Sequence, residues 1–173
     1  ANIDTTGNGG GNVVIQSGTQ IFINSSINAS GGDVVMDANN SVQVSSTITA
    51  DRATLQGASV FMDTDGIINA SGDVALNALS SSVNMSSGSR VTSSGGNILV
   101  NGNSADITGL DAPAGTVVVS AKSITDAGDA NADVSGARAM LFATNGNVGA
   151  ANPIDTALGT LAGFASGGTF KAT

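Results

Sequence analysis

The chain has 173 residues, which suits one domain, and it carries 5 Lys and Arg against 13 Asp, for a net charge of −8. It contains no Glu, His, Cys, Trp or Tyr, which excludes disulfides, thiolate or imidazole catalysis and zinc fingers. The acidity and the five scattered cations exclude a surface that tracks nucleic-acid phosphates.

The apolar residues are numerous enough for a core but are not clustered into a membrane span. Hydrophobic residues make up 40% of the chain, which is too many for a disordered chain. The longest apolar run, near residues 117–119, is far below the roughly 20 residues that cross a bilayer. The opening ANIDTTGNGG lacks the basic start and apolar stretch of a signal peptide. We expect no membrane span, and any export signal to lie outside this chain.

The segment GGNVVIQ at residues 10–16 recurs along the chain at nearly constant spacing. Similar segments are GGDVVMD at 31–37, RATLQ at 52–56, SGDVALN at 71–77, GGNILVN at 95–101 and GTVVVS at 115–120. Their first apolar residues are separated by steps of 21, 19, 21, 24 and 19 residues. A period of about 21 residues, with insertions in the turns, is typical of a solenoid.

Two more apolar triplets follow within each period. The second is apolar at both outer positions and variable at its centre, as in Ile21-Phe22-Ile23 and Val42-Gln43-Val44. This two-residue alternation is typical of a strand with one buried face. The third triplet joins an inward aliphatic, an outward polar and an inward small residue, as at residues 27–29, 48–50, 68–70, 91–93 and 110–112.

Three short strands per period, separated by Gly, Asn, Asp and Ser, predict an all-β fold. We expect a right-handed parallel β-helix of about seven coils of roughly 21 residues, in which each strand pairs with its copy one period later, about 4.8 Å along the axis. No L-x-x-L-x-L frame supports a leucine-rich horseshoe. A β-sandwich would need alternating hairpin turns, whereas these sides return in the same order.

Polar residues recur on both sides of the first strand of each period. Asn12, Asp33, Asp73 and Asn97 precede it, and we place Gln16, Asp37, Gln56, Asn77 and Asn101 in the corner that follows it. Asn and Asp side chains satisfy turn amides and can stack as ladders along a solenoid.

We expect residues 1–173 to form a single repeat segment of a longer protein. Residues 2–5 match the third triplet, so the chain opens within a coil, and Gly167-Gly168-Thr169-Phe170 resembles the start of another first strand. Residues 1–112 are predicted to form regular coils. Residues 113–173 are predicted to form modified coils with longer turns, including the insertion at 126–136.

The strands GGNVVIQSG and SGDVALNA resemble repeats of the filamentous hemagglutinin family, large bacterial exoproteins secreted by two-partner (type Vb) systems. Residues 124–163 are similar to a recurring adhesin segment in which an Ile-Thr-Asp-Ala-Gly stretch precedes a Gly-x-x-x-Asn-Pro-hydrophobic-Asp-Thr motif. That motif is carried here by Gly149, Asn152, Pro153, Ile154, Asp155 and Thr156. The resemblance implies a β-helical shaft at the bacterial surface or outside the cell, exported by an outer-membrane transporter that acts on the parent protein. It carries over no functional residue.

The alternative function is a polysaccharide-binding or polysaccharide-degrading β-helix. Asp33 and Asp73 share a column two coils apart, about 10 Å by strand spacing, and acid pairs cleave glycosidic bonds. Asn12 and Asn97 occupy the same column, which favours a turn role for all four. Arg52 and Arg138 lie about four coils apart and Arg90 faces another corner, so no cationic centre forms. We predict no enzymatic activity and no cofactor.

Calcium binding is a second possibility. Asp63-Thr64-Asp65-Gly66 begins like an EF-hand loop, but no Glu stands at the twelfth position. Asp126, Asp129 and Asp133 are close enough in sequence to gather around a cation. We favour a solvated acidic turn and predict no metal site.

The outward positions of the first strand offer a third lead. The outward column of the third strand is polar, with Asn28, Thr49, Asn69, Thr92 and Asp111, and on the second strand Phe22 and Phe61 are separated by Gln43. By contrast, the first strand presents an almost wholly apolar column, and apolar strips of this kind receive partners. We name it the partner-contact strip: Val14, Val35, Thr54, Ala75, Leu99 and Val118. The predicted partner is a host-cell or surface receptor, such as a glycan, and the predicted function is a non-enzymatic structural or adhesive shaft.

Overall fold

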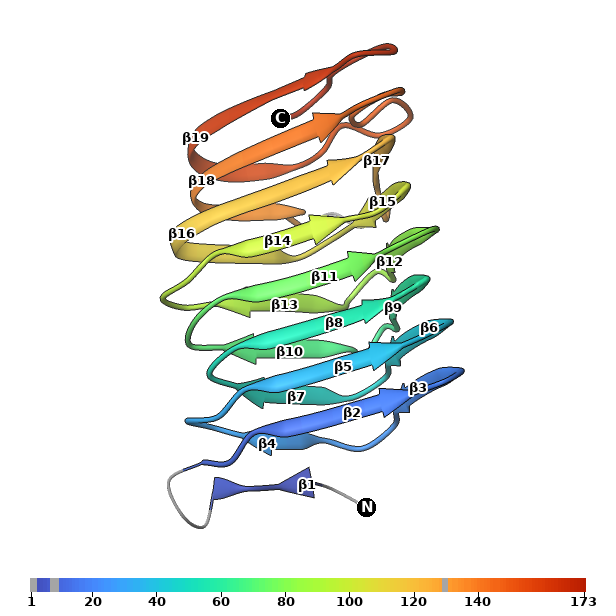
Figure 1. Cartoon of the computed structure of the whole chain (residues 1–173). Helices are drawn as coiled ribbons and strands as arrows, with labels where there is room; N and C mark the ends of the chain where they lie inside the picture. Colours follow the sequence, from blue (N-terminus) through green and yellow to red (C-terminus); the bar gives the residue numbers. More distant parts are fainter. Residues whose placement is uncertain (1–2, 7–9, 129–130) are drawn as a thin grey trace.

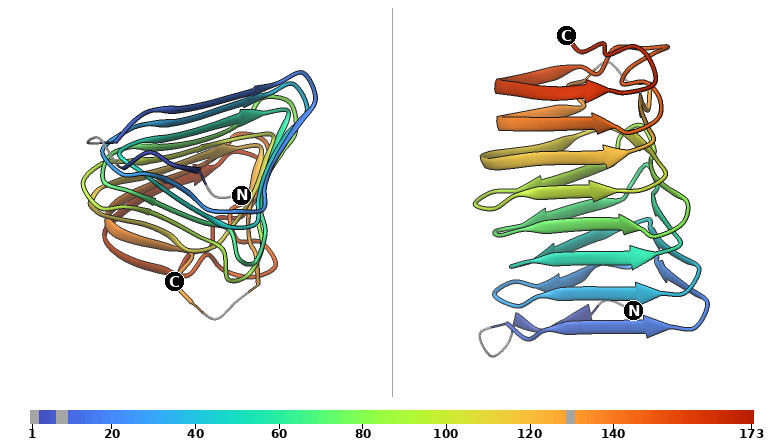
Figure 2. Two further views of the ribbon diagram at one scale, coloured as in Figure 1. Left: turned by 90° about the horizontal axis from the view of Figure 1, so that it is seen from below. Right: turned by 45° about the horizontal axis from the view of Figure 1, so that its top comes forward.

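The fold is a parallel β-helix, as the repeat predicts. A computed structural model describes residues 3–6, 10–128 and 131–173, and in these ranges the chain forms strands β1–β19 and no α-helix. The strands stack in right-handed turns along one axis (Figure 1). The two views of Figure 2 show successive coils lying over one another with a gradual rotation about that axis.

The first strands of the coils form one continuous parallel ladder of eight rungs. Its register runs through Val13, Val34, Ala53, Val74, Ile98, Val117, Ala139 and Leu161. The separate first strands are β2 (Val13–Ser17), β5 (Val34–Ala38), β8 (Ala53–Gly57), β11 (Val74–Ala78) and β14 (Ile98–Asn101). The degenerate segment at 52–56 is therefore a full member of the ladder.

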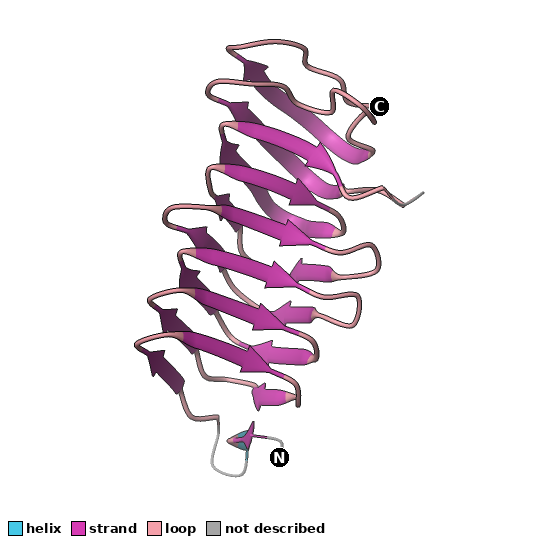
Figure 3. Cartoon of the chain, turned by 90° about the vertical axis from the view of Figure 1, so that its right-hand side faces the viewer, coloured by secondary structure: helices cyan, strands magenta, loops and turns pink. Residues whose placement is uncertain are grey.

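The second and third sides are built in the same way, as Figure 3 shows from the side of the stack. The second strands are β3 (Gln20–Ile23), β6 (Ser41–Val44), β9 (Ser59–Met62), β12 (Ser82–Met85), β15 (Ser104–Ile107) and β17 (Ser123–Asp126). The third strands are β1 (Ile3–Asp4), β4 (Ile27–Ala29), β7 (Thr47–Ala50), β10 (Ile67–Ala70) and β13 (Arg90–Ser93). Pairing of Ile3 with Ile27 confirms that residues 3–4 belong to the third side.

In the last three coils the third and first strands merge. The strands β16 (Leu110–Ala121), β18 (Val134–Ala143) and β19 (Thr156–Ala165) each pass through the position where the earlier coils turn. The ladder register shifts between Ala112 and Thr116, around the Pro113-Ala114-Gly115 stretch. The merged strands join the first and third sides into one 13-stranded sheet, beside the 6-stranded sheet of the second side.

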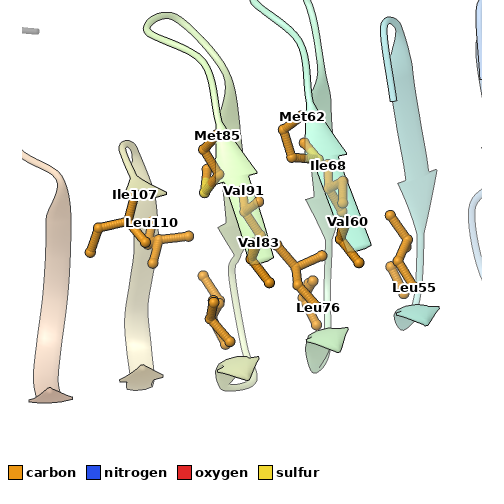
Figure 4. Close-up of a cluster of buried hydrophobic side chains, with 14 of the residues drawn as sticks. Leu55, Val60, Met62, Ile68, Leu76, Val83, Met85, Val91, Ile107 and Leu110 are labelled. Carbon is orange, nitrogen blue, oxygen red and sulfur yellow. The ribbon is translucent and has the colours of Figure 1, made fainter. Parts of the chain in front are cut away.

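Inward side chains from the three sides fill the interior. Figure 4 shows Leu55, Val60, Met62, Ile68 and Leu76 converging from different sides of neighbouring coils, and all five are fully buried. Each such side chain contributes about 1.5–3 kcal/mol through removal from water. The remaining stabilisation comes from ladder hydrogen bonds, which exist only between coils, so the coils stabilise one another.

The C-terminal coil departs from the prediction in one place. Residues 167–170 were expected to begin another first strand, but Phe170 pairs with Val148 and so continues the second side. The first strand of this coil is instead the second half of β19, which lacks the Gly-Gly pair that precedes β2, β5 and β14. Gly163 replaces the aliphatic residue of Leu141 in the ladder. A Cβ at this position would lie 2.7 Å from the Phe170 ring, so the small residue makes room for the large one.

Candidate functional site

The structure aligns the partner-contact strip as one column. Val14, Val35, Thr54, Ala75, Leu99 and Val118 are successive partners in the parallel ladder. Val14 is 63% exposed and Leu99 37% exposed, and the other four are half-buried. The strip therefore lies on the outside of the first side and is open to contact; its role in binding stays a prediction.

The column extends two rungs further than the sequence indicated. Met140, 37% exposed, pairs with Val118, and Ala162 pairs with Met140. Beside them, Phe142 and Phe164 face outward with ring centroids 5.8 Å apart, and Phe164 is 49% exposed. The sequence feature that predicts this extension is the two-residue alternation of inward and outward side chains in RAMLFA at 138–143 and TLAGFA at 160–165.

A ladder of polar residues flanks the strip on the side where each first strand begins. The Oδ1 of Asn12 accepts the backbone N–H of Asp33 at 2.9 Å, and the Oδ1 of Asp73 accepts that of Asn97 at 2.7 Å. Asn97 in turn accepts the N–H of Thr116 at 3.0 Å. Three of the four Asx side chains, those of Asn12, Asp73 and Asn97, thus satisfy a backbone amide of the next coil, as predicted, whereas the Asp33 carboxylate binds Arg52 instead.

The polar residues on the other flank correct a prediction. Gln16, Asp37, Gln56, Asn77 and Asn101 are not in a corner but are the second outward residues of β2, β5, β8, β11 and β14. The strands continue past the strip residue, by three residues in β2, β5, β8 and β11 and by two in β14, so these polar residues lie within the ladder. Within this column, Gln56 donates to Asp37 at 3.3 Å and Asn101 donates to Asn77 at 3.0 Å.

The candidate acid pair Asp33 and Asp73 is separated by a cation. Arg52 lies between them in the column, and its Nε and Nη2 each bind a carboxylate oxygen of Asp33 at 3.2 Å. The Asp33 carboxylate also raises the pKa of Arg52 through hydrogen bonding and charge. Asp33 and Asp73 are thus engaged in cross-coil contacts, one with Arg52 and the other with Asn97.

The other arginines are placed as predicted. The register from Arg52 through Asp73, Asn97 and Thr116 to Arg138 spans four coils, and Arg138 is exposed. Arg90 begins β13 on the third side and binds Asp111 through Nη2 at 2.8 Å. No cationic centre forms from these three residues.

The candidate calcium residues have other contacts. Asp63 accepts hydrogen bonds from Gln43, at 2.7 Å, and from Ser45, which lower the pKa of its carboxyl. Asp133 is buried and accepts the N–H of Asp155 at 2.8 Å, Asp126 accepts the N–H of Gly128, and Asp129 lies outside the described residues. In the described ranges, no three acidic side chains gather as metal ligands would.

On the second side, one outward carboxylate is perturbed by burial. Asp106 stands in the column of Phe22, Gln43, Phe61 and Asn84. Burial raises the pKa of Asp106, a 3.0 Å hydrogen bond from Thr125 opposes this, and the charge of Asp126 adds to it. The register also confirms that Gln43 separates Phe22 from Phe61.

Three hollows of the surface contain no acidic residue. One hollow, about 510 Å³, lies at the N-terminal coil and is lined by isoleucines, among them Ile3, Ile15 and Ile27, together with polar residues such as Gln16 and Gln20. A second, about 400 Å³, lies beside Arg90 and Ser135, and a shallow third lies over Thr49, Asn69 and Thr92. None of the three is lined by Asp.

The segment that resembles the adhesin motif forms the turn from the second to the third side. Gly149 has a φ of +62°, and a Cβ there would meet the backbone of Ile154 at 2.9 Å. Ile154 is buried, and Asp155 accepts a hydrogen bond from Thr173 at 2.6 Å. The motif therefore has a structural role in this coil.

No family model, no curated protein and no solved structure matches the chain. The resemblance to the filamentous hemagglutinin family thus rests on the residues quoted for it. Across the three described ranges, no helix has the length and apolar character needed to cross a membrane.

Proposed function

We propose that this chain is a non-enzymatic shaft segment of a large secreted bacterial surface protein that mediates attachment to cells or surfaces. The observation that carries the proposal is the unbroken eight-rung ladder around a filled core. A stack of this kind resists bending because each coil is hydrogen-bonded to both neighbours. It presents the same outward column over its whole length, which suits repeated weak contacts with an extended partner.

The use of the acidic residues supports a non-enzymatic role. Glycoside cleavage needs two carboxyl groups that flank the scissile bond and are free to act as acid and as base or nucleophile. Asp33 is held by Arg52, and Asp73 is hydrogen-bonded to Asn97. The runner-up function, binding or degradation of a polysaccharide, would have to use residues that already serve the ladder.

Export is the second part of the proposal. A chain without Cys is compatible with passage in unfolded form through an outer-membrane transporter that recognises the parent protein, and with folding outside the cell. The coil-by-coil architecture fits this route, because each coil can add to the ladder of the preceding one as it emerges.

Attachment of beads coated with the chain, to cells and to abiotic surfaces, tests the proposal. We expect attachment above that of albumin-coated beads, and a loss of at least about half after Val118→Asp, because a charge interrupts the apolar strip. Asn69→Asp adds the same charge on the polar third side and is the matched control. Release of reducing or unsaturated sugars from a panel of polysaccharides, abolished by Asp33→Asn or Asp73→Asn, would instead establish the enzyme.

A further inference from the structure

The first side presents three parallel outward ladders, which together we name the docking face. The partner-contact strip, extended by Met140 and Ala162, forms its centre. The column before the strip comprises Asn12, Asp33, Arg52, Asp73, Asn97, Thr116, Arg138 and Thr160. The column after it comprises Gln16, Asp37, Gln56, Asn77, Asn101, Ser120, Phe142 and Phe164.

We propose that the partner of the docking face is a second copy of this chain, bound face to face with its axis antiparallel. The two-fold axis would pass between the coils of Ala75 and Leu99, so that the first of the eight rungs faces the last. This inference rests on the partner-contact role proposed for the strip and names its occupant.

Side-chain sizes along the strip are complementary in this arrangement. Ala75 of one copy faces Leu99 of the other, and Thr54 faces Val118. Continuing outward, Val35 faces Met140 and the most exposed rung, Val14, faces Ala162. Next to the two-fold axis, Ala75 meets the larger Leu99, and at the outermost rungs Val14 meets the smaller Ala162. Pairing a small side chain with a large one allows two sheets to approach evenly.

The charges select the antiparallel orientation. The antiparallel pairing brings Arg138 of one copy opposite Asp33 of the other, at both ends of the interface. Arg138 is exposed, and the ion pairs among the described residues are Arg52–Asp33 and Arg90–Asp111, so its charge is available. A parallel two-fold would instead bring Asp33 opposite Asp37, and two like charges would repel.

The docking face is large enough for a stable dimer. Eight rungs at about 4.8 Å give a length of about 34 Å, and three outward columns about 7 Å apart, with their side chains, give a width of about 20 Å. The pair would bury roughly 1,400 Å² in total, within the range of specific interfaces. One mismatch remains, because Asp37 faces the Phe142 ring, and Asp37→Asn should therefore tighten the dimer.

Sedimentation equilibrium of the whole chain, from about 1 to 100 µM, measures the association. We expect a monomer–dimer equilibrium that weakens at least about tenfold with Leu99→Lys, which places two charges beside the axis. Arg138→Asp should weaken it several-fold, and Asp37→Asn should strengthen it. Asn69→Lys, on the third side, adds the same charge as Leu99→Lys and should leave the dimer unchanged.

The absence of native Cys allows the orientation to be tested directly. Oxidation of a mixture of the Thr54→Cys and Val118→Cys chains should give mainly the mixed disulfide, because these positions face each other only in the antiparallel pair. A chain that stays monomeric throughout, or disulfides that join identical positions, would refute the pairing. Either result would leave the shaft proposal standing, because attachment of beads coated with the unmutated chain tests that proposal without reference to the dimer.

Discussion

At the scale of single residues, two aspartates, Asp106 on the second side and Asp63 at the corner that follows it, are perturbed in opposite directions. Asp63 accepts hydrogen bonds from Gln43 and Ser45, which stabilise its charged form and lower its pKa. Asp106 is partly removed from water, which destabilises its charged form and raises its pKa. The surroundings of the two carboxyl groups, and not the residue type, decide whether the pKa is raised or lowered.

The two residues should therefore respond oppositely to neutralisation. At pH 7, Asp63→Asn should lower the free energy of unfolding by about 1 kcal/mol, and Asp106→Asn should raise it slightly, since it removes a desolvated charge. The contribution of Asp63 is present above the ordinary pKa of 3.8 and is lost as the pH falls through its lower folded value. The penalty at Asp106 is likewise absent once the pH falls below 3.8.

Urea unfolding of both variants and the parent chain, at pH 7 and near pH 3, measures these effects. Both differences should shrink at the lower pH. Equal shifts of the same sign for the two variants at pH 7 would contradict the assigned causes.

At the scale of the strand and its corners, the Asn and Asp side chains that precede the first strands connect neighbouring coils through hydrogen bonds. Asn97 uses both ends of its side chain: Oδ1 accepts the N–H of Thr116 in the following coil, and Nδ2 donates to Asp73 in the preceding one, at 3.2 Å. Such contacts fix the register of the first strands at the corner where the chain enters them.

Asn97→Ala should destabilise the chain by about 1 kcal/mol, because it leaves a turn amide without its side-chain partner. Thermal unfolding followed by circular dichroism measures the loss. Asn69→Ala, on the outward column of the third side, is the control and should change the midpoint little. An equal loss from both variants would show that the ladder contacts do not matter.

The sequence predicted these elements best where the turn residues are regular. Gly-Gly or Ser-Gly followed by Asn or Asp marked β2, β5, β11 and β14 because the turn needs these residues locally. No such turn signal precedes the first-side halves of β18 and β19, because a strand that continues from the third side makes no turn there. The pair of Phe142 and Phe164 on the docking face was not predicted from the sequence, because these residues lie in the two strand halves that no turn signal precedes.

At the scale of the whole molecule, stability is a property of the stack. An inner coil has a neighbour on each side, whereas β1 and β19 end the described ladders. In such arrays each coil depends on the interfaces with its nearest neighbours, and opening begins at the ends.

Native-state hydrogen exchange should therefore follow position along the axis. The amides of β8, β11 and β14 should exchange slowest and those of β1 and β19 fastest, although all lie in similar strands. Mass spectrometry of peptides at several exchange times measures the gradient. Uniform protection from one end to the other would show that the molecule opens only as a single cooperative unit.

The amino-acid sequence by itself determined the period, the three sides of each coil and the inward and outward assignment of residues. It did so because burial of one strand face imposes a two-residue alternation, and stacking imposes the same alternation on every copy. Only the tertiary structure decided that Arg52 separates Asp33 from Asp73, that three coils merge two of their strands, and that Phe170 fills the space beside Gly163. These features depend on contacts between residues about 7 to 24 positions apart, across coils whose turns differ in length, and no local pattern records them.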